Sequence, residues 1–264
     1  MPTLTLKEIK DLCYSALREA GANDLQATTA AQELMDAEAE GIRNVGLGYL
    51  PHYLNHLRCG KLIGDATPEI VKQSASAVVV NANFGFCHTA YLHAEEELIA
   101  MTQREGLGMM AIHNSYSAGV LGWFVRRLGE RGLVSLMFAN SSKAVAAHGG
   151  KVPFFGTNPL AFGSPRKDEG PVVVDMATAS TARVNLVQAA KEGRQIEPGH
   201  AIDPQGNPTT DPAEGLKGAQ LPVGGPKGFG LGLFYIKNIC KAHGWVVNLE
   251  SEVGQGTTIS ILIP

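Results

Sequence analysis

The sequence predicts a globular α/β protein whose helices and strands do not follow a regular βαβ repeat. Hydrophobic residues make up 44% and charged residues 18% of the 264 residues, a balance typical of chains that bury a core. Short runs rich in β-branched residues alternate with runs of helical periodicity. The links between these runs vary in length, whereas in a doubly wound parallel sheet strands and helices alternate at regular spacing.

Three helices are expected at the start of the chain. Thr5 and Glu8 stand in capping-box positions ahead of apolar residues at helical spacing. A second helix is expected to begin near Asn23 or Asp24 and to carry Leu25, Ala31, Leu34 and Met35. Pro51 suits the first turn of a third helix, where its missing N–H is not needed.

The middle of the chain predicts alternating elements and the end predicts a hairpin. Strands are expected over residues 77–80, 108–112, 133–138 and 172–175, and helices over residues 88–103, 120–128 and 182–192. The strand that ends at Asp175 is apolar and is expected to be buried. The Gly- and Pro-rich stretch 193–225 excludes long regular elements. After it, the pattern predicts an amphipathic helix from Leu233 and then two strands, 245–250 and 257–263.

Composition excludes several classes of function. The net charge of -3 gives no reason to expect nucleic acid or an anionic membrane surface as a partner. No apolar run has the length of a membrane span, and residues 1–10 lack the features of a signal peptide. The four cysteines lie far apart without the spacing of metal ligands. Free thiols indicate a reducing cytoplasm.

Familiar nucleotide and hydrolase motifs do not explain the chain. No Gly-x-Gly-x-x-Gly run stands between a strand and a helix, and no Walker loop occurs. His148-Gly149-Gly150 lacks the Gly-x-Ser-x-Gly elbow of a hydrolase. What remains are loops of small polar residues at 138–142, 155–160 and 174–180. The loop 155–160 is expected to be an exposed turn, and such loops can present N–H groups and hydroxyls to phosphate or ribose.

These loops occur among other short motifs in a distinctive order. The motifs from residue 138 onward are Phe138-Ala139-Asn140-Ser141, Gly149-Gly150, Gly156-Thr157-Asn158-Pro159-Leu160-Ala161-Phe162, Pro165-Arg166, Val174-Asp175-Met176-Ala177-Thr178, Asn207-Pro208-Thr209-Thr210-Asp211-Pro212 and Gly225-x-Lys227-Gly228-Phe229-Gly230-Leu231. Those before it are Ala37-Glu38-x-x-Gly41-Ile42, Leu50-Pro51-x-Tyr53, Leu57-x-x-Gly60, Asn83-x-Gly85-Phe86 and Asn114-Ser115 with Gly119 and Leu121-Gly122. Over about residues 1–233 the sequence resembles the malate/L-lactate dehydrogenase family, and GTNPLAF together with DMAT is a specific signature.

The resemblance implies a fold, a cofactor and a reaction. The fold is not of the Rossmann type but has a largely antiparallel sheet with flanking helices, in a homodimer. The reaction is hydride transfer between NAD or NADP and a small 2-oxo or 2-hydroxy acid. The positions that match cofactor contacts are Ser141, Asp175, Met176, Ala177 and Lys227. Lys227 suits a phosphate, Ser141 offers a hydroxyl, and Asp175 could accept from a ribose or orient a catalytic partner.

The family's catalytic segment is altered in this chain. The family reads Ser-His-Gly-x-x-Arg where this chain reads Asn44-Val45-Gly46-Leu47-Gly48-Tyr49, so the proton-donating His is Val45 and the carboxylate-binding Arg is Tyr49. A second family His falls on Ser117. Reduction of a carbonyl needs an acid to protonate the developing alkoxide. The residues that are candidates for this role are Tyr116, Tyr49, His148 and His113. Arg43 is the candidate for the substrate carboxylate.

The tail carries a second resemblance. The run Gly228-Phe229-Gly230-Leu231-Gly232-Leu233 and the residues after it are similar to the closing segment of a sensor histidine kinase ATP-binding domain. The kinase Asp-x-Gly-x-Gly loop has no match upstream. This implies a chimera with a dehydrogenase-like domain over 1–233, truncated and completed by a kinase-like helix and hairpin over 228–264. A nucleotide-binding or interaction module and an inactive scaffold remain the alternatives.

Overall fold

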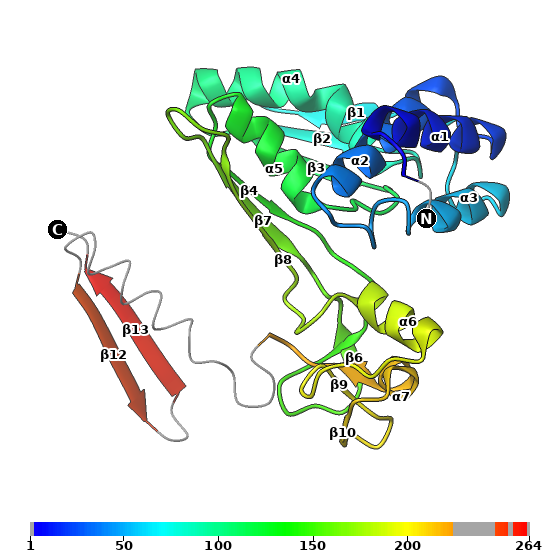
Figure 1. Ribbon diagram of the computed structural model, residues 1–264. Coiled ribbons are helices and arrows are strands. Elements are labelled where there is room, and N and C mark those ends of the chain that lie inside the picture. The colour runs from blue at the N-terminus through cyan, green and yellow to red at the C-terminus, as the bar shows by residue number, and fades with distance from the viewer. Residues whose placement is uncertain (1–2, 224–245, 253–255, 263–264) are drawn as a thin grey trace. The chain divides into compact units, whose positions relative to one another are not determined.

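The computed structural model describes residues 3–223, 246–252 and 256–262, and it divides the chain into two compact units (Figure 1). The first unit comprises Met1–Ala139 and Pro159–Met176, and the second comprises Asn140–Asn158 and Ala177–Pro264. The boundary expected from the sequence near residues 228–233 lies outside the described residues. In the described part of the chain, no helix combines the length and the apolar character that crossing a bilayer requires.

Three helices open the first unit, as the sequence predicts. They are α1 (Leu6–Glu19), α2 (Asp24–Ala39) and α3 (Leu50–Arg58). Thr5 forms the complete capping box with Glu8, the Asn23 side chain accepts the amide of Gln26, and Pro51 lies in the first turn of α3. The helices pack around a core whose buried members include Leu17, Leu34, Tyr53, Leu62 and Phe86.

A three-stranded sheet follows in the same unit. It contains β1 (Glu69–Gln73), β2 (Ala77–Asn81) and β3 (Met109–His113), in that order, and α4 (Cys87–Glu105) connects β2 to β3. The pair β2–β3 is parallel and β1–β2 is antiparallel. The sequence predicts β2, α4 and β3 but misses β1, because all its residues are exposed and no apolar alternation marks it.

A second three-stranded sheet of this unit is antiparallel. It consists of β4 (Ser135–Phe138), β7 (Leu160–Ser164) and β8 (Val172–Met176), with β7 in the centre, and α5 (Leu121–Glu130) packs on it (Figure 1). A Cβ on Gly163 of β7 would lie 2.4 Å from the Val125 carbonyl oxygen of α5, so glycine permits this close packing. The expectation of a buried strand at 172–175 is wrong, because Val172, Val174 and Met176 are exposed on the face away from α5.

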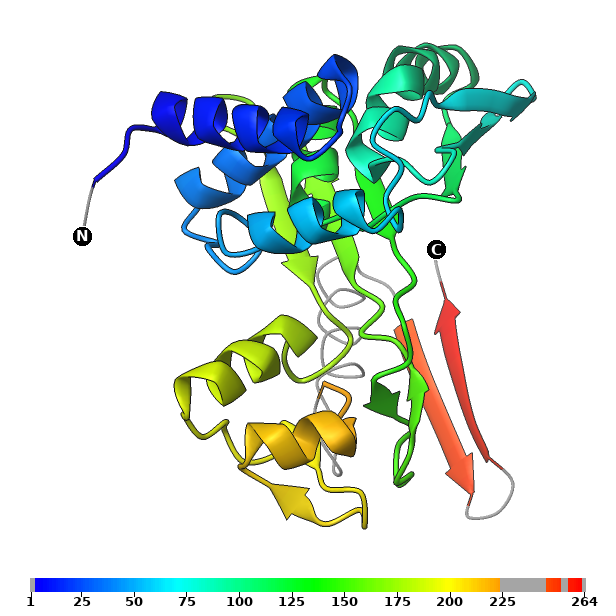
Figure 2. The same ribbon diagram turned by 90° about the vertical axis from the view of Figure 1, so that its right-hand side faces the viewer.

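The second unit is built from short elements. Its sheet has the order β10 (Pro208–Thr209), β9 (Ala201–Ile202), β11 (Ala219–Gln220), β5 (Val145–Ala146) and β6 (Pro153–Phe155). Helices α6 (Arg183–Glu192) and α7 (Pro212–Lys217) lie against each other in this unit (Figure 2). In the described part of the Gly- and Pro-rich stretch, residues 193–223, the named elements are therefore only two-residue strands and one short helix, as predicted.

The tail forms the hairpin that the sequence predicts. β12 (Val246–Glu252) pairs antiparallel with β13 (Gly256–Leu262) in perfect one-to-one register. The helix expected from Leu233 lies outside the described residues. Apart from the parallel pairs β2–β3 and β5–β11, the named strand pairs are antiparallel, which confirms a mixed α/β fold with largely antiparallel sheets.

Candidate active site

Three polar loops of the second unit are hydrogen-bonded to one another. The Ser141 amide donates to Asn158 Oδ1 at 3.1 Å, and the Asn158 amide donates to Ser141 Oγ at 3.3 Å. The hydroxyls of Ser141 and Thr157 are 3.0 Å apart. Thr178 donates both its amide and its hydroxyl to the Thr157 carbonyl at 2.9 Å. Residues far apart in sequence thus form one cradle of amides and hydroxyls, which we call the polar cradle: Ser141, Thr157, Asn158 and Thr178.

The polar cradle depends on backbone shape. A Cβ on Gly156 would lie 2.3 Å from the Ser141 carbonyl oxygen and 2.4 Å from Asn158 Oδ1, so any larger residue forces the loops apart. Asn158 has a φ of 32°, a conformation that few non-glycine residues tolerate. Phe155 is exposed, but Gly156 is buried and residues 157–160 are half-buried, so the expectation of an exposed turn is wrong from Gly156 onward. Leu160 already belongs to strand β7.

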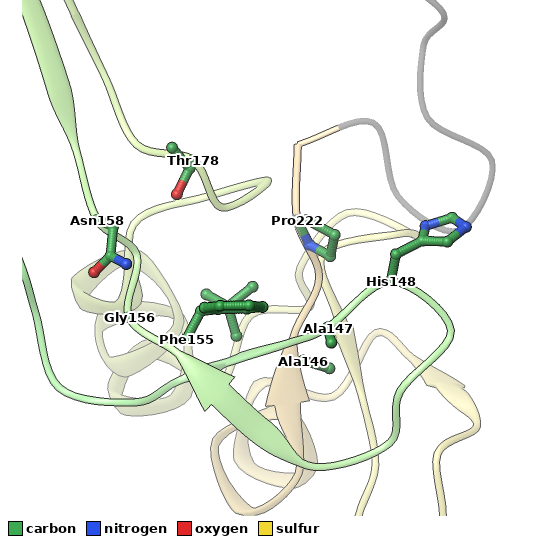
Figure 3. Close-up of a pocket in the computed structure, with 9 residues that line it drawn as sticks. Ala146, Ala147, His148, Phe155, Gly156, Asn158, Thr178 and Pro222 are labelled. Carbon is green, nitrogen blue, oxygen red and sulfur yellow. The ribbon is translucent and has the colours of Figure 1, made fainter. Parts of the chain in front are cut away.

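An open cavity of about 320 Å³ adjoins the polar cradle (Figure 3). Its lining residues are Val145, Ala146, Ala147, His148, Phe155, Gly156, Asn158, Thr178 and Pro222. Apolar walls with a few polar groups are typical of small-molecule sites, and the volume lies at the lower end of their range of roughly 300–1,000 Å³. The cavity wall combines the apolar side chains of Phe155 and Pro222 with the polar side chains of Asn158 and Thr178. His148 stands exposed at the rim.

Of the expected cofactor positions, Ser141 belongs to the polar cradle and Asp175 has another partner. The Asp175 carboxylate accepts the Gly122 amide at 2.8 Å, in the first turn of α5. Val120, at the N-cap, provides no side-chain cap for that helix. Burial raises the pKa of Asp175, against the lowering effect of the amide hydrogen bonds. Asp175 therefore stabilises the start of α5.

The other expected cofactor positions are distributed between the units. Met176 follows Asp175 in the first unit and is exposed, whereas Ala177 opens the second segment of the second unit and is half-buried. Lys227 lies outside the described residues.

The altered catalytic segment forms the turn between α2 and α3. Glu38 holds this turn, because its carboxylate accepts the Leu47 amide at 2.7 Å. Val45 is half-buried within it, and Arg43 is exposed. Among the described residues, no carboxylate lies within ion-pair distance of Arg43, so its guanidinium is available to an anion.

The structure brings Tyr49 and Tyr116 together in the first unit. Both rings pack edge-on against Tyr53, with centroid distances of 5.2 Å and 5.6 Å. Burial raises the pKa of Tyr116, and charge interaction and hydrogen bonding with Tyr49 raise it further. His56, which the sequence analysis missed, is hydrogen-bonded through Nδ1 to the Tyr116 hydroxyl. The spacing of Tyr49, Tyr53 and His56 along one helix face is the signal that could have identified it.

The two remaining histidine candidates lie elsewhere. His113 is exposed at the end of β3 in the first unit, whereas His148 belongs to the second unit. Of the candidates for the acid, only Tyr49 and Tyr116 therefore share a cluster.

The fold and these features define a class of protein. Largely antiparallel sheets, a polar cradle without a glycine-rich dinucleotide turn, and an apolar cavity beside it are the attributes of a non-Rossmann α/β oxidoreductase. The family model described as malate/L-lactate dehydrogenase matches residues 4–235, and the chain belongs to this family.

Individual relatives agree with this assignment. The chain is 38% identical to a "(2R)-3-sulfolactate dehydrogenase (NADP(+))" of Chromohalobacter salexigens, over 87% of this chain and 69% of the relative. It is 37% identical to a Δ1-pyrroline-2-carboxylate/Δ1-piperideine-2-carboxylate reductase of Pseudomonas putida, over 86% and 67%. The crystal structure of Δ1-piperideine-2-carboxylate reductase from Pseudomonas syringae superposes with a TM-score of 0.83 at 34% identity, covering 89% of this chain and 71% of the other. The chain thus spans about two thirds of the length of these relatives.

Proposed function

We propose that the chain is an NAD(P)-dependent oxidoreductase that interconverts a small 2-oxo acid and the corresponding 2-hydroxy acid. The observation that carries this proposal is the polar cradle beside the apolar cavity in a chain of this family. The relatives named as dehydrogenases and reductases act on small carboxylic acids, which supports the substrate class.

The described residues fit a pyridine nucleotide. The backbone amides of the polar cradle donate within it, so its side chains supply the groups for a cofactor. Asn158 Nδ2 can donate to a ribose or phosphate oxygen, and the hydroxyl oxygens of Ser141 and Thr178 can accept from a ribose hydroxyl. Phe155 offers an apolar surface to a ring. When bound, the cofactor supplies or accepts the hydride at the substrate carbon. We propose Asp175, Met176, Ala177 and Lys227 as further cofactor contacts, on the resemblance alone.

Substrate binding is proposed for the first unit. Arg43 is exposed and available to pair with the substrate carboxylate. Tyr49 and Tyr116 carry hydroxyls that can hydrogen-bond the substrate oxygen. The exposed His148 and His113 are the alternatives as the acid.

Cofactor fluorescence tests the proposal. NADH and NADPH should each be titrated into the protein while nicotinamide emission is followed, and saturable binding of at least one is expected. Lys227→Ala should weaken binding by about 1–3 kcal/mol if the lysine meets a phosphate, with the exposed Lys72→Ala as matched control. A panel of pyruvate, oxaloacetate and related 2-oxo acids should then identify a substrate. Failure of both cofactors to bind at millimolar concentration refutes the proposed function, and binding without turnover favours an inactive scaffold.

We also propose that the protein forms a homodimer in the cytoplasm. The outer face of the β4–β7–β8 sheet exposes a contiguous set of apolar side chains: Leu136, Phe138, Val172, Val174 and Met176. Large exposed apolar patches mark association sites. In light scattering, Phe138→Asp should yield a monomer, whereas the equally exposed Leu107→Asp, outside this face, should not.

For the tail we propose a kinase-like origin. The match to the dehydrogenase family ends at residue 235, and β12 and β13 pair with each other as a separate two-stranded sheet. If this segment binds nucleotide by itself, ATP should raise the melting temperature of the protein. If ATP does not change the melting temperature and NADH or NADPH binds, the nucleotide-binding module is excluded and the oxidoreductase function is supported.

A further inference from the structure

The hydrogen bond between His56 and Tyr116 joins two segments that are 60 residues apart. His56 lies in the last turn of α3, and the two ring centroids are 5.4 Å apart at an angle of 68°. The side chains of His56 and Tyr116 are half-buried. Tyr53 and Phe86 are fully buried in the core, and their rings pack against the ring of Tyr116. The pair therefore rests on the core of the first unit and keeps access to solvent.

The loop that carries Tyr116 is held by strained backbone. Asn83, Phe84 and Asn114 have positive φ values of 49°, 63° and 48°, and Phe84 is a bulky residue that is 57% exposed. The Phe84 amide donates to the Asn114 carbonyl at 2.7 Å, and the Tyr116 amide donates to the Gly85 carbonyl at 2.8 Å. Strained residues that persist in a fold cluster at functional sites, where they hold a side chain in place. Here these backbone hydrogen bonds hold the backbone of Tyr116 against Gly85, and His56 is hydrogen-bonded to its hydroxyl.

The pair also lies beside the altered catalytic segment. Tyr49, at the position of the family's arginine, interacts with Tyr116 and packs against His52 at 5.1 Å. Val45 in the same segment has no ionisable group, so protonation of a substrate oxygen must come from elsewhere. Tyr116 is the half-buried hydroxyl of this region that a second ionisable side chain supports.

We propose that Tyr116 donates the proton to the substrate oxygen and that the protonated imidazole of His56 returns a proton to Tyr116. The proposal rests on the proposed function. As the substrate carbon gains a hydride, its C=O double bond becomes a single bond and the oxygen takes the proton of the Tyr116 hydroxyl. The phenolate takes the Nδ1 proton of His56, which regains one from water. The 2-oxo acid is thereby reduced to the 2-hydroxy acid while the nicotinamide cofactor is oxidised. Tyr116 is the catalytic residue and His56 is a positioning and relay residue.

The charges around the pair define its pH dependence. Burial lowers the pKa of His56 below its ordinary value of 6.5, and Lys61 and His52 lower it further. On the other side, burial, Tyr49 and Cys59 raise the pKa of Tyr116, so its hydroxyl stays protonated at neutral pH, as a donor must. Reduction needs protonated His56, and its rate should fall as pH rises through the His56 pKa. Oxidation needs the neutral ring and should have the opposite dependence.

The test compares Tyr116→Phe, His56→Gln and His56→Ala with the exposed α4 histidine variant His93→Gln as matched control. General acid catalysis contributes about 10²- to 10⁴-fold, so Tyr116→Phe should lower the kcat of reduction about 100-fold or more, with KM changed less than about threefold. His56→Gln should lower kcat about tenfold and remove the inflection from the pH profile of reduction. Imidazole in the buffer should restore turnover to His56→Ala, whereas His93→Gln should behave as the unaltered protein.

Three measurements give results that do not depend on turnover. The pKa of His56, measured by NMR titration of the cofactor-free protein, should coincide with the kinetic inflection. Nicotinamide fluorescence should show unchanged cofactor binding in every variant, and circular dichroism should show that each is folded. Near-normal turnover in folded Tyr116→Phe, or a retained inflection in the pH profile of His56→Gln, overturns the proton relay but leaves the proposed oxidoreductase function intact. Absence of both cofactor binding and turnover in the unaltered protein overturns the proposed function and the relay with it.

Discussion

Replacement of Glu33 by Gln should remove a pH dependence of stability that buried ionisable groups impose on the first unit. Glu33 of α2 is 1% exposed, and burial raises its pKa from 4.5 to about 8, against the lowering effects of the Val120 amide and the Tyr53 hydroxyl. His88 of α4 is fully buried, and burial lowers its pKa from 6.5 to about 3. A Cβ on Gly119 would lie 2.5 Å from Glu33 Oε1 and 3.4 Å from His88 Cε1, so both groups approach the same glycine.

The two groups act in opposite directions on the free energy of unfolding. Because the pKa of Glu33 is raised by folding, its contribution is full below pH 4.5 and is lost as pH rises towards 8. Because the pKa of His88 is lowered, its contribution is full above pH 6.5 and is lost as pH falls towards 3. Between its unfolded and its folded pKa, each group changes the free energy of unfolding by about 1.4 kcal/mol per pH unit. The two slopes cancel between pH 4.5 and 6.5, and between pH 6.5 and 8 Glu33 alone lowers stability by about 2 kcal/mol.

Urea unfolding at pH 6.5 and pH 8 measures this difference. The unaltered protein should lose about 2 kcal/mol between the two values, whereas Glu33→Gln should lose much less, because the amide does not ionise. Comparing each protein with itself cancels any cost of the substitution that does not depend on pH. The exposed Glu69→Gln is the matched control and should retain the full loss. An equal loss in Glu33→Gln would refute the burial argument.

Packing and thiol burial lead to further predictions. Gly163→Ala should lower the free energy of unfolding by about 1–3 kcal/mol, because its Cβ overlaps the backbone of α5; Gly170→Ala, where the space is open, should have little effect, and equal urea midpoints would contradict this. Cys59 is exposed and should react with a thiol reagent in the native protein. Burial raises the pKa of Cys13 to about 12 and of Cys87 to about 11, so peptide mapping should find both unmodified until urea is added, and early labelling of either would count against its burial.

Part of the candidate site follows from motifs and part from contacts between distant residues. The sequence motifs identify the loops at Ser141 and Ala177 as candidates for cofactor binding. In the structure, Ser141 is hydrogen-bonded to Asn158 and Thr157. The sequence does not reveal that the Asp175 carboxylate accepts a hydrogen bond at the start of α5, because the two residues are 53 positions apart. Nor does a sequence state which hydroxyls face a cavity.

By itself the sequence determined the local features of this protein: the starts of α1, α2 and α3, the succession β2, α4, β3, α5 and β4, and the tail hairpin. It did not predict β5, β6 and β7, which lie between β4 and β8 in the chain. These depend on interactions within a few residues, such as the capping box of Thr5 and the fixed φ of Pro51. Only the tertiary structure decided that β7 lies between β4 and β8 and that His56 meets Tyr116. Such contacts form because burial of apolar surface brings together segments that are distant along the chain, and no local pattern records which segments these are.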